Sequence, residues 1–100
     1  MLDKLEAIQA RFDEVGVALT NPEIVGNNQK FSALSKEYRS LEKIVRARKE
    51  YLASLDDVKS YREALNGNDE ELREMAKEEL PGVESKKDDL EKYIRQLLIP

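Results

Sequence analysis

The sequence predicts an all-α fold built from three long amphipathic helices. Apolar residues recur every three or four positions over most of the 100 residues, which is the spacing of helices that bury one face. Charged residues make up 38% of the chain and aromatic residues 6%, a balance typical of long surface helices. A chain of this length has room for one core or one continuous seam, so we expect residues 1–100 to form a single helical domain.

The first helix is expected from residue 2 to about residue 19, because its apolar residues fall on one side of a helix. These residues are Leu2, Leu5, Ile8, Phe12, Val15 and Leu19. Asn21 and Pro22 are a typical N-cap and first helical residue, so they predict a single turn over residues 22–25. Gly26 is expected to close this turn in the left-handed conformation, and Asn27 or Asn28 to cap the next helix.

The second helix is predicted to run without interruption to residue 65, since no Gly or Pro occurs between Gly26 and Gly67. At about 1.5 Å per residue it extends to roughly 55 Å. Gly67 suits its C-terminal cap, and Asn68 with Glu71 resembles a capping box for the helix that follows. Tyr51 flanks the apolar series, and we expect its ring to pack while its hydroxyl stays in water. The series itself is Phe31, Leu34, Tyr38, Leu41, Val45, Leu52 and Leu55.

The third helix carries apolar residues at the same spacing, but Pro81-Gly82 lies inside it. Proline removes a helical hydrogen bond and clashes with the preceding turn, so a kink or break is expected near these residues, with a non-helical joint over residues 79–85. The short connection at residues 66–69 predicts an antiparallel helical hairpin or coiled-coil arm with the shorter N-terminal helix packed on its base. The apolar series is Leu72, Met75, Ala76, Leu80, Val83, Leu90, Ile94, Leu97 and Leu98.

Several kinds of chemistry are disfavoured by what the sequence does not contain. There is no Cys and no His, so no disulfide, thiolate nucleophile or imidazole base is available, and we expect no enzyme activity and no cofactor or metal. The acidic clusters at residues 69–74 and 88–91 are attributed to helix termini and solvated faces. The N-terminal residues are too acidic for a signal peptide, and no apolar run approaches a membrane span. We therefore expect a cytoplasmic chain with no membrane and no small-molecule substrate among its partners.

A row of basic residues is the strongest candidate for a functional surface. Lys36, Arg39, Lys43 and Arg46 recur three or four residues apart and lie away from the apolar series. Residues 27–66 contain nine basic and six acidic side chains, whereas residues 67–100 contain six and ten. The row therefore predicts either a contact with RNA or an acidic protein surface, or a solvated face that pairs with the acidic third helix.

Several ordered segments resemble the N-terminal domain of bacterial class I peptide chain release factors, and most of all the release factor one group. They are the Asn21-Pro22-Glu23 turn, the helix "KFSALSKEYRSLEKIV" over residues 30–45, the acidic segment "DEELREMAKEEL" over residues 69–80, and the ending "LLIP" at residues 97–100. The family's stop-codon tripeptide and its Gly-Gly-Gln loop have no counterpart among these residues.

The resemblance implies the N-terminal domain of a longer translation termination factor. It implies a domain that binds the ribosome, at the stalk base of the large subunit through ribosomal RNA or protein, without decoding or hydrolytic residues of its own. Two other functions remain open: a tRNA-binding helical arm of a seryl-tRNA-synthetase-like enzyme, and a coiled-coil adaptor or chaperone. The sequence does not identify the stop codons, the oligomeric state, or the helix face that meets the ribosome.

Overall fold

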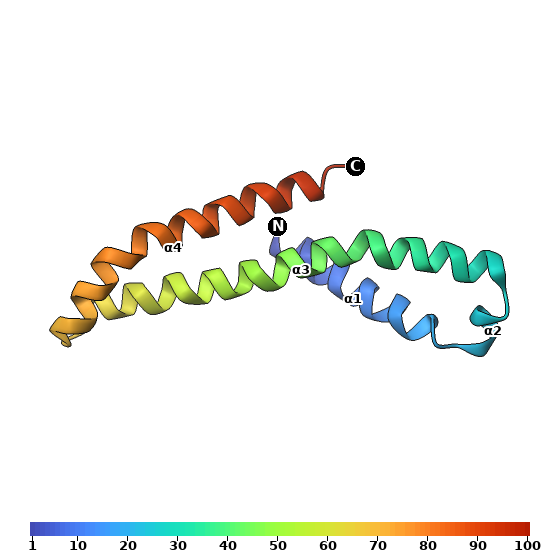
Figure 1. The fold of residues 1–100 in the computed structure, drawn as a ribbon, viewed down its shortest axis with the longest axis horizontal. Coiled ribbons are helices and arrows are strands. Elements are labelled where there is room, and N and C mark those ends of the chain that lie inside the picture. Colours follow the sequence, from blue (N-terminus) through green and yellow to red (C-terminus); the bar gives the residue numbers. More distant parts are fainter. The chain divides into compact units, whose positions relative to one another are not determined.

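The structure is a computed structural model that describes all 100 residues, Met1–Pro100. It contains four helices and no strand: α1 (Leu2–Ala18), α2 (Pro22–Val25), α3 (Asn28–Leu65) and α4 (Glu70–Leu97) (Figure 1). The predicted all-α class and the three long helices are confirmed. The chain forms two compact units, Met1–Arg46 and Ala47–Pro100, whose boundary falls within α3, and each is described separately.

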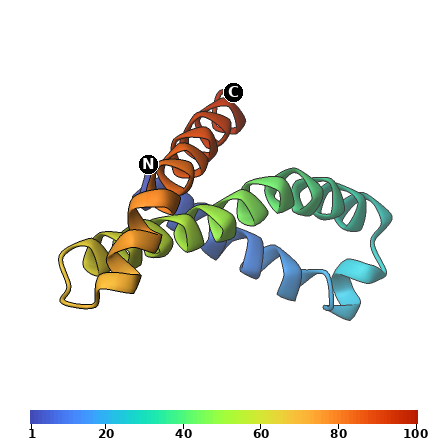
Figure 2. The same ribbon diagram turned by 60° about the vertical axis from the view of Figure 1, so that its left-hand side comes forward.

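In the N-terminal unit, α1 lies beside the first part of α3 and runs antiparallel to it (Figures 1 and 2). Phe12 and Tyr38 stack across the two helices with ring centroids 4.4 Å apart. Gly16 lies beside the same ring, and a Cβ atom there would stand 3.6 Å from the Tyr38 ring, an ordinary contact distance. Leu5 and Val15 are fully buried, so the helical series predicted for residues 2–19 identifies the packed face of α1.

The junction between α1 and α3 is the capped single turn that the Asn-Pro pair predicts. The Asn21 side chain accepts a hydrogen bond from the Glu23 N–H at 2.9 Å, and Asn27 caps α3 by accepting from the Lys30 N–H at 3.1 Å. The predicted left-handed conformation of Gly26 is wrong, because its φ is −76°. Its N–H donates to the Pro22 carbonyl, so the right-handed turn simply continues to Gly26 and needs no reversal.

In the C-terminal unit, the rest of α3 and α4 form the predicted antiparallel hairpin (Figure 1). Its core contains Ala47, Tyr51, Ser54, Val58, Ala76 and Ile94. The Tyr51 hydroxyl lies 3.1 Å from Glu91 Oε1, and an Arg62 guanidinium nitrogen lies 3.3 Å from Glu84 Oε1. The expectation that the Tyr51 hydroxyl stays in water is wrong, because the carboxylate of α4 takes the place of water and allows the whole ring to be buried.

Of the kink or break predicted near Pro81-Gly82, the structure contains no break: α4 is one continuous, curved helix from Glu70 to Leu97, so the non-helical joint expected over residues 79–85 is wrong (Figure 1). Proline costs about 3 kcal/mol in a helix interior, mainly through one missing hydrogen bond and a clash with the preceding turn. Pro81 and Gly82 are exposed, so water can reach the carbonyl that has lost its donor. Ala76 before them and Ile94 after them are both buried, so packing on either side of the proline outweighs this local cost.

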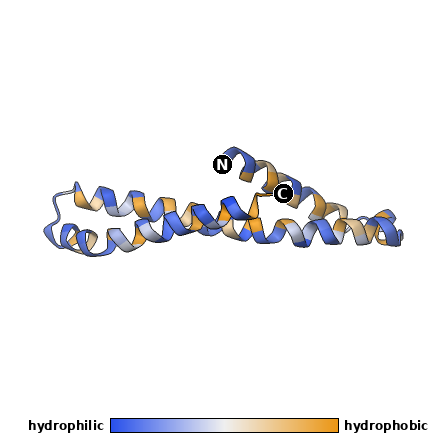
Figure 3. Cartoon of the chain, turned by 90° about the horizontal axis from the view of Figure 1, so that it is seen from above, coloured by the Kyte–Doolittle hydropathy of each residue, from blue (hydrophilic) through white to orange (hydrophobic).

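The start of α4 also differs in detail from the prediction. Its N-cap is Asp69, whose side chain accepts from the Leu72 N–H at 3.1 Å, and not Asn68. Groups of hydrophobic residues recur between hydrophilic ones along the long helices, as expected for amphipathic helices (Figure 3). Leu72 and Met75 nevertheless remain 47% and 44% exposed, although their spacing places them in the apolar series. No helix is both long and apolar enough to cross a membrane.

Candidate functional site

The four basic residues singled out in the sequence, Lys36, Arg39, Lys43 and Arg46, all lie on α3 within the N-terminal unit and are all exposed. We call them the basic stripe. At about 100° of rotation per residue, they fall within an arc of about 80° on α3. The apolar residues Leu34, Tyr38, Leu41 and Val45 are centred about 150° away on the same helix. The stripe therefore lies on a different face of α3 from the packed residues of this unit, as the spacing predicted.

The charges of the stripe are mostly unpaired within this unit. Arg46 pairs with Glu42 one turn earlier on α3, and its side chain remains 78% exposed. Arg39 Nε is 3.4 Å from the Ser35 carbonyl, a contact with its own helix. Lys36 and Lys43 form no ion pair. Four exposed cations along roughly three helical turns make a positive surface that can attract phosphates or carboxylates.

Lys36 also borders a shallow hollow at the beginning of α3. The hollow has a volume of about 580 Å³, and its other lining residues are Asn28, Gln29, Ser32 and Ala33. None of these neighbours is acidic, and they are short or polar, so nothing in the hollow neutralises the Lys36 ammonium. This end of the stripe is therefore accessible to a large anionic partner.

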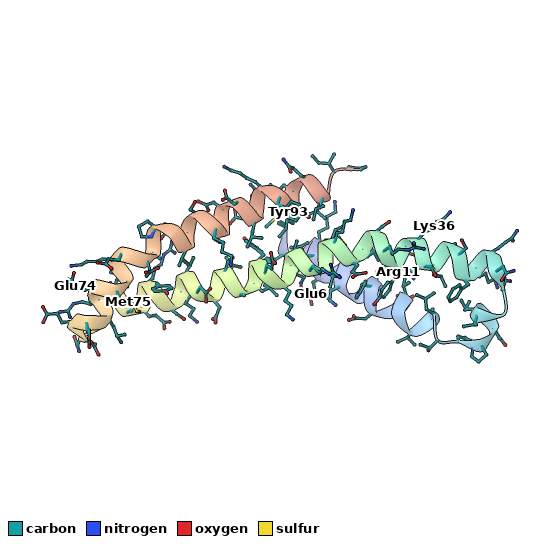
Figure 4. All side chains as sticks on the ribbon, in the orientation of Figure 1. Glu6, Arg11, Lys36, Glu74, Met75 and Tyr93 are labelled. Carbon is teal, nitrogen blue, oxygen red and sulfur yellow. The ribbon has the colours of Figure 1, made fainter.

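Arg11, on α1 of this unit, has a structural role. Arg11 on α1 reaches Glu37 on α3 with two nitrogen–oxygen distances of 2.6 and 2.8 Å. Figure 4 shows Arg11 between the two helices, whereas Lys36 extends from the side of α3 away from α1. The hydrogen bond from Arg11 lowers the pKa of Glu37 below its usual value and keeps this carboxylate ionised. Glu37 is thereby engaged with α1 and is not paired with a stripe residue.

Sequence reasoning missed this bidentate pair because its members lie 26 residues apart on different helices. Local spacing detects pairs three or four residues apart and carries no information about such a partner. The only available signal was that Arg11 and Glu37 each sit next to an aromatic residue of the seam, Phe12 and Tyr38. The stacking of these rings brings the two charges together.

Some members of the acidic clusters have structural partners. Asp69 is the N-cap of α4, and Lys87 Nζ lies 2.8 Å from Asp88 and 3.0 Å from Glu91. These contacts raise the pKa of Lys87 and lower the pKa of Glu91, so both groups stay charged near neutral pH. No group of three or more potential ligands is arranged to hold a metal ion. The basic stripe therefore remains the candidate site best supported by geometry.

Comparisons with known proteins give a consistent result. A family model described as the PCRF domain matches residues 8–100. Peptide chain release factor 1 of Cytophaga hutchinsonii is 46% identical over 101 residues, and that of Helicobacter pylori strain G27 is 47% identical over 100 residues. Peptide chain release factor 1 of Parabacteroides distasonis is 42% identical over 101 residues. Each comparison covers the whole of this chain but only 27–28% of the relative's length. No solved structure matches the chain.

Proposed function

Since the chain belongs to the PCRF domain family, we propose that it is the ribosome-binding N-terminal domain of a peptide chain release factor and acts in translation termination in the cytoplasm. Support comes from the release-factor-1 relatives, which align over the entire chain at 42–47% identity. The names of these relatives favour termination over the tRNA-synthetase arm or the adaptor. The chain spans only about 28% of the first two relatives, so the role of the whole protein is part of this proposal.

The observation that carries the ribosome-binding role is the basic stripe. Lys36, Arg39, Lys43 and Arg46 present positive charge on the face of α3 opposite its apolar seam, where the fold does not use it. Ribosomal RNA presents a dense array of phosphates, and neutralising them releases counterions, which favours binding. We infer that the stripe contacts ribosomal RNA or an acidic protein surface at the stalk base of the large subunit.

The same proposal assigns no hydrolytic step to these 100 residues. They contain no Cys, no His and no Gly-Gly-Gln sequence, so the usual nucleophiles and bases are missing. We infer that this domain is not an enzyme, takes no small-molecule substrate and contributes binding and positioning. The isolated chain is accordingly expected to release no peptide in a stop-codon-dependent assay with programmed ribosomes, and stop-dependent release by the chain alone would contradict this inference.

The stripe is tested by reversing two of its charges, Arg39→Glu together with Lys43→Glu, and measuring the affinity of the chain for purified ribosomes over a range of salt concentrations. If both residues contact phosphates, affinity falls most at low salt. The steepness of log affinity against log salt should then decrease by about 1.4 to 1.8, since each contact contributes about 0.7 to 0.9. The melting temperature should change little, because both side chains are exposed.

A matched control reverses two exposed lysines of α4, Lys86→Glu together with Lys92→Glu, and should leave ribosome affinity nearly unchanged. This control has the same change in net charge, so it separates a local contact from a general electrostatic effect. Failure of the unmodified chain to bind ribosomes would overturn the proposal. Unchanged affinity in the stripe variant with a lower melting temperature would instead show that the stripe stabilises the fold by pairing with acidic residues.

A further inference from the structure

The C-terminal unit has an apolar hollow at the end of the hairpin where α3 passes into α4. Its volume is about 380 Å³. Leu72 and Met75 on its α4 side are 47% and 44% exposed, and Figure 4 shows Met75 near the closed end of the hairpin. We call this surface the tip patch, and its lining residues are Asp57, Ser60, Tyr61, Ala64, Leu72 and Met75.

Acidic side chains surround Met75 on α4, and we call Glu71, Glu78 and Glu79 the acidic rim of the tip patch. Glu71, Glu78 and Glu79 lie four residues before, three after and four after Met75, which makes them its neighbours on the surface of α4. None of the three forms an ion pair, and Asp57 inside the hollow forms none either. Residues 66–80 contain six acidic and two basic side chains, a net charge of −4.

The two basic residues of this segment are already engaged. Arg73 donates to the Gly67 carbonyl at 3.0 Å, and Lys77 pairs with Glu74 at 3.1 Å. The rim therefore keeps its negative charge. Helix polarity explains acids in the first turn of α4, but this effect fades within one turn and does not account for Glu78 and Glu79. Both lie one helical turn after Met75, so the unpaired negative charge and the exposed apolar surface occupy the same part of α4.

We propose that the tip patch is a docking site for a basic amphipathic helix of a partner protein. Such a helix has apolar side chains on one face to enter the hollow and Lys or Arg side chains beside them to meet the glutamates. Nucleic acid and anionic membranes carry the wrong charge for this rim. The inference goes beyond the ribosome-binding proposal, because it concerns a different unit, a protein partner and a different set of residues.

The exposure of Leu72 and Met75 fits this role better than a role in the core. A single exposed apolar residue is ordinary, whereas two that share a hollow with Tyr61 form a patch with a defined shape. The hollow can accept one or two side chains, and the flanking carboxylates then set the orientation of the bound helix. Affinity should come mostly from the apolar anchors, and discrimination against acidic partners from the rim.

The probe for this site is a synthetic amphipathic peptide of about five helical turns, with leucines on one face and lysines elsewhere. The control peptide has the same composition in an order that spreads the leucines around the helix. Nuclear magnetic resonance spectra of the isotope-labelled chain are recorded during titration with each peptide. The amphipathic peptide should shift signals of residues 57–64 and 71–79 and bind at least several-fold more tightly than the control.

The variant Leu72→Gln with Met75→Gln removes both apolar anchors and should weaken binding of the amphipathic peptide by about tenfold or more. Its circular dichroism should match the unmodified chain, since both residues are on the surface. The control variant Val17→Gln, at a residue that is 71% exposed in the other unit, should keep the affinity within about twofold. Glu78→Gln with Glu79→Gln should weaken binding and reduce its salt dependence.

Three results would overturn the inference. The first is equal affinity for the two peptides, which would reduce the effect to net charge. The second is unchanged affinity in the Leu72 and Met75 double variant, or signal shifts confined to other residues. The third is concentration-dependent dimerisation in sedimentation that disappears in the same double variant, which would assign the patch to a second copy of this chain.

Discussion

Truncation of Ile94 to alanine is the sharpest test of the packing in the C-terminal unit. Ile94 lies on α4, and none of its side-chain surface is exposed. Ile94→Ala removes three carbon atoms, and at about 0.8 kcal/mol per buried methylene the loss of burial alone is about 2.4 kcal/mol. A cavity that does not collapse adds about 1 to 2 kcal/mol.

One smaller effect has the opposite sign. Alanine is the better helix former, and the substitution regains about 0.4 kcal/mol of helix propensity. The net loss in the free energy of unfolding is therefore expected at about 3 to 4 kcal/mol. Domains of this size are stable by about 5 to 15 kcal/mol, so the variant should still fold but with a much lower denaturation midpoint.

Urea denaturation followed by circular dichroism at the helical band measures this loss. The control is Ile99→Ala, which deletes the same atoms from a residue that is 70% exposed beyond the end of α4, and it should cost less than about 0.5 kcal/mol. A loss below about 1 kcal/mol for Ile94→Ala, or equal losses for the two variants, would refute the burial of Ile94 in a packed core.

Two further substitutions test particular interactions. The pKa of Glu37 is lowered by its hydrogen bond from Arg11, so the stabilisation is present above the ordinary pKa of about 4.3 and is lost as the pH falls through the lower folded value. Glu37→Gln should therefore lose less stability than the unmodified chain when urea melts at pH 7 and pH 3 are compared, and an identical pH dependence would contradict the pair. Pro81→Ala should raise stability by up to about 3 kcal/mol in urea melts, because an exposed helix interior regains a hydrogen bond; lower stability would show that the curvature at Pro81 is needed for packing.

The helices were predictable because their signals are local. A period of three to four residues located the packed faces of α1 and α4, and Asn21 with Pro22 marked the short turn between α1 and α3. The series predicted for α3 is wrong beyond residue 46, because the buried residues there are Ala47, Tyr51, Ser54 and Val58, whereas Leu52 is 39% exposed. The basic stripe was predictable for the same reason, since residues at this spacing share a helix face whatever the tertiary structure. Its partner was not, because this spacing indicates a positive surface without identifying which anionic surface it meets.

The errors share a different cause, which is competition between a local preference and distant packing. Pro81 favours a break, but burial of Ala76 before it and Ile94 after it keeps α4 continuous. Tyr51 flanks the apolar series, yet Glu91, 40 residues away, supplies the acceptor that permits burial of its ring. Periodicity shows which residues share a helix face but not how deeply each is buried. The exposure of Leu72 and Met75 was therefore evident only from the structure.

The two proposed surfaces differ in the physical origin of their affinity. The basic stripe offers charge without apolar area, so its binding should decline steeply with salt and tolerate changes in partner sequence. The tip patch offers apolar area within a negative rim, so part of its affinity should persist when salt screens the glutamates. Because the two surfaces have opposite charge, a polyanion competes only for the basic stripe and a polycation only for the tip patch. A partner assembly that contains both RNA and basic protein, as a ribosome does, can therefore engage both surfaces without competition between them.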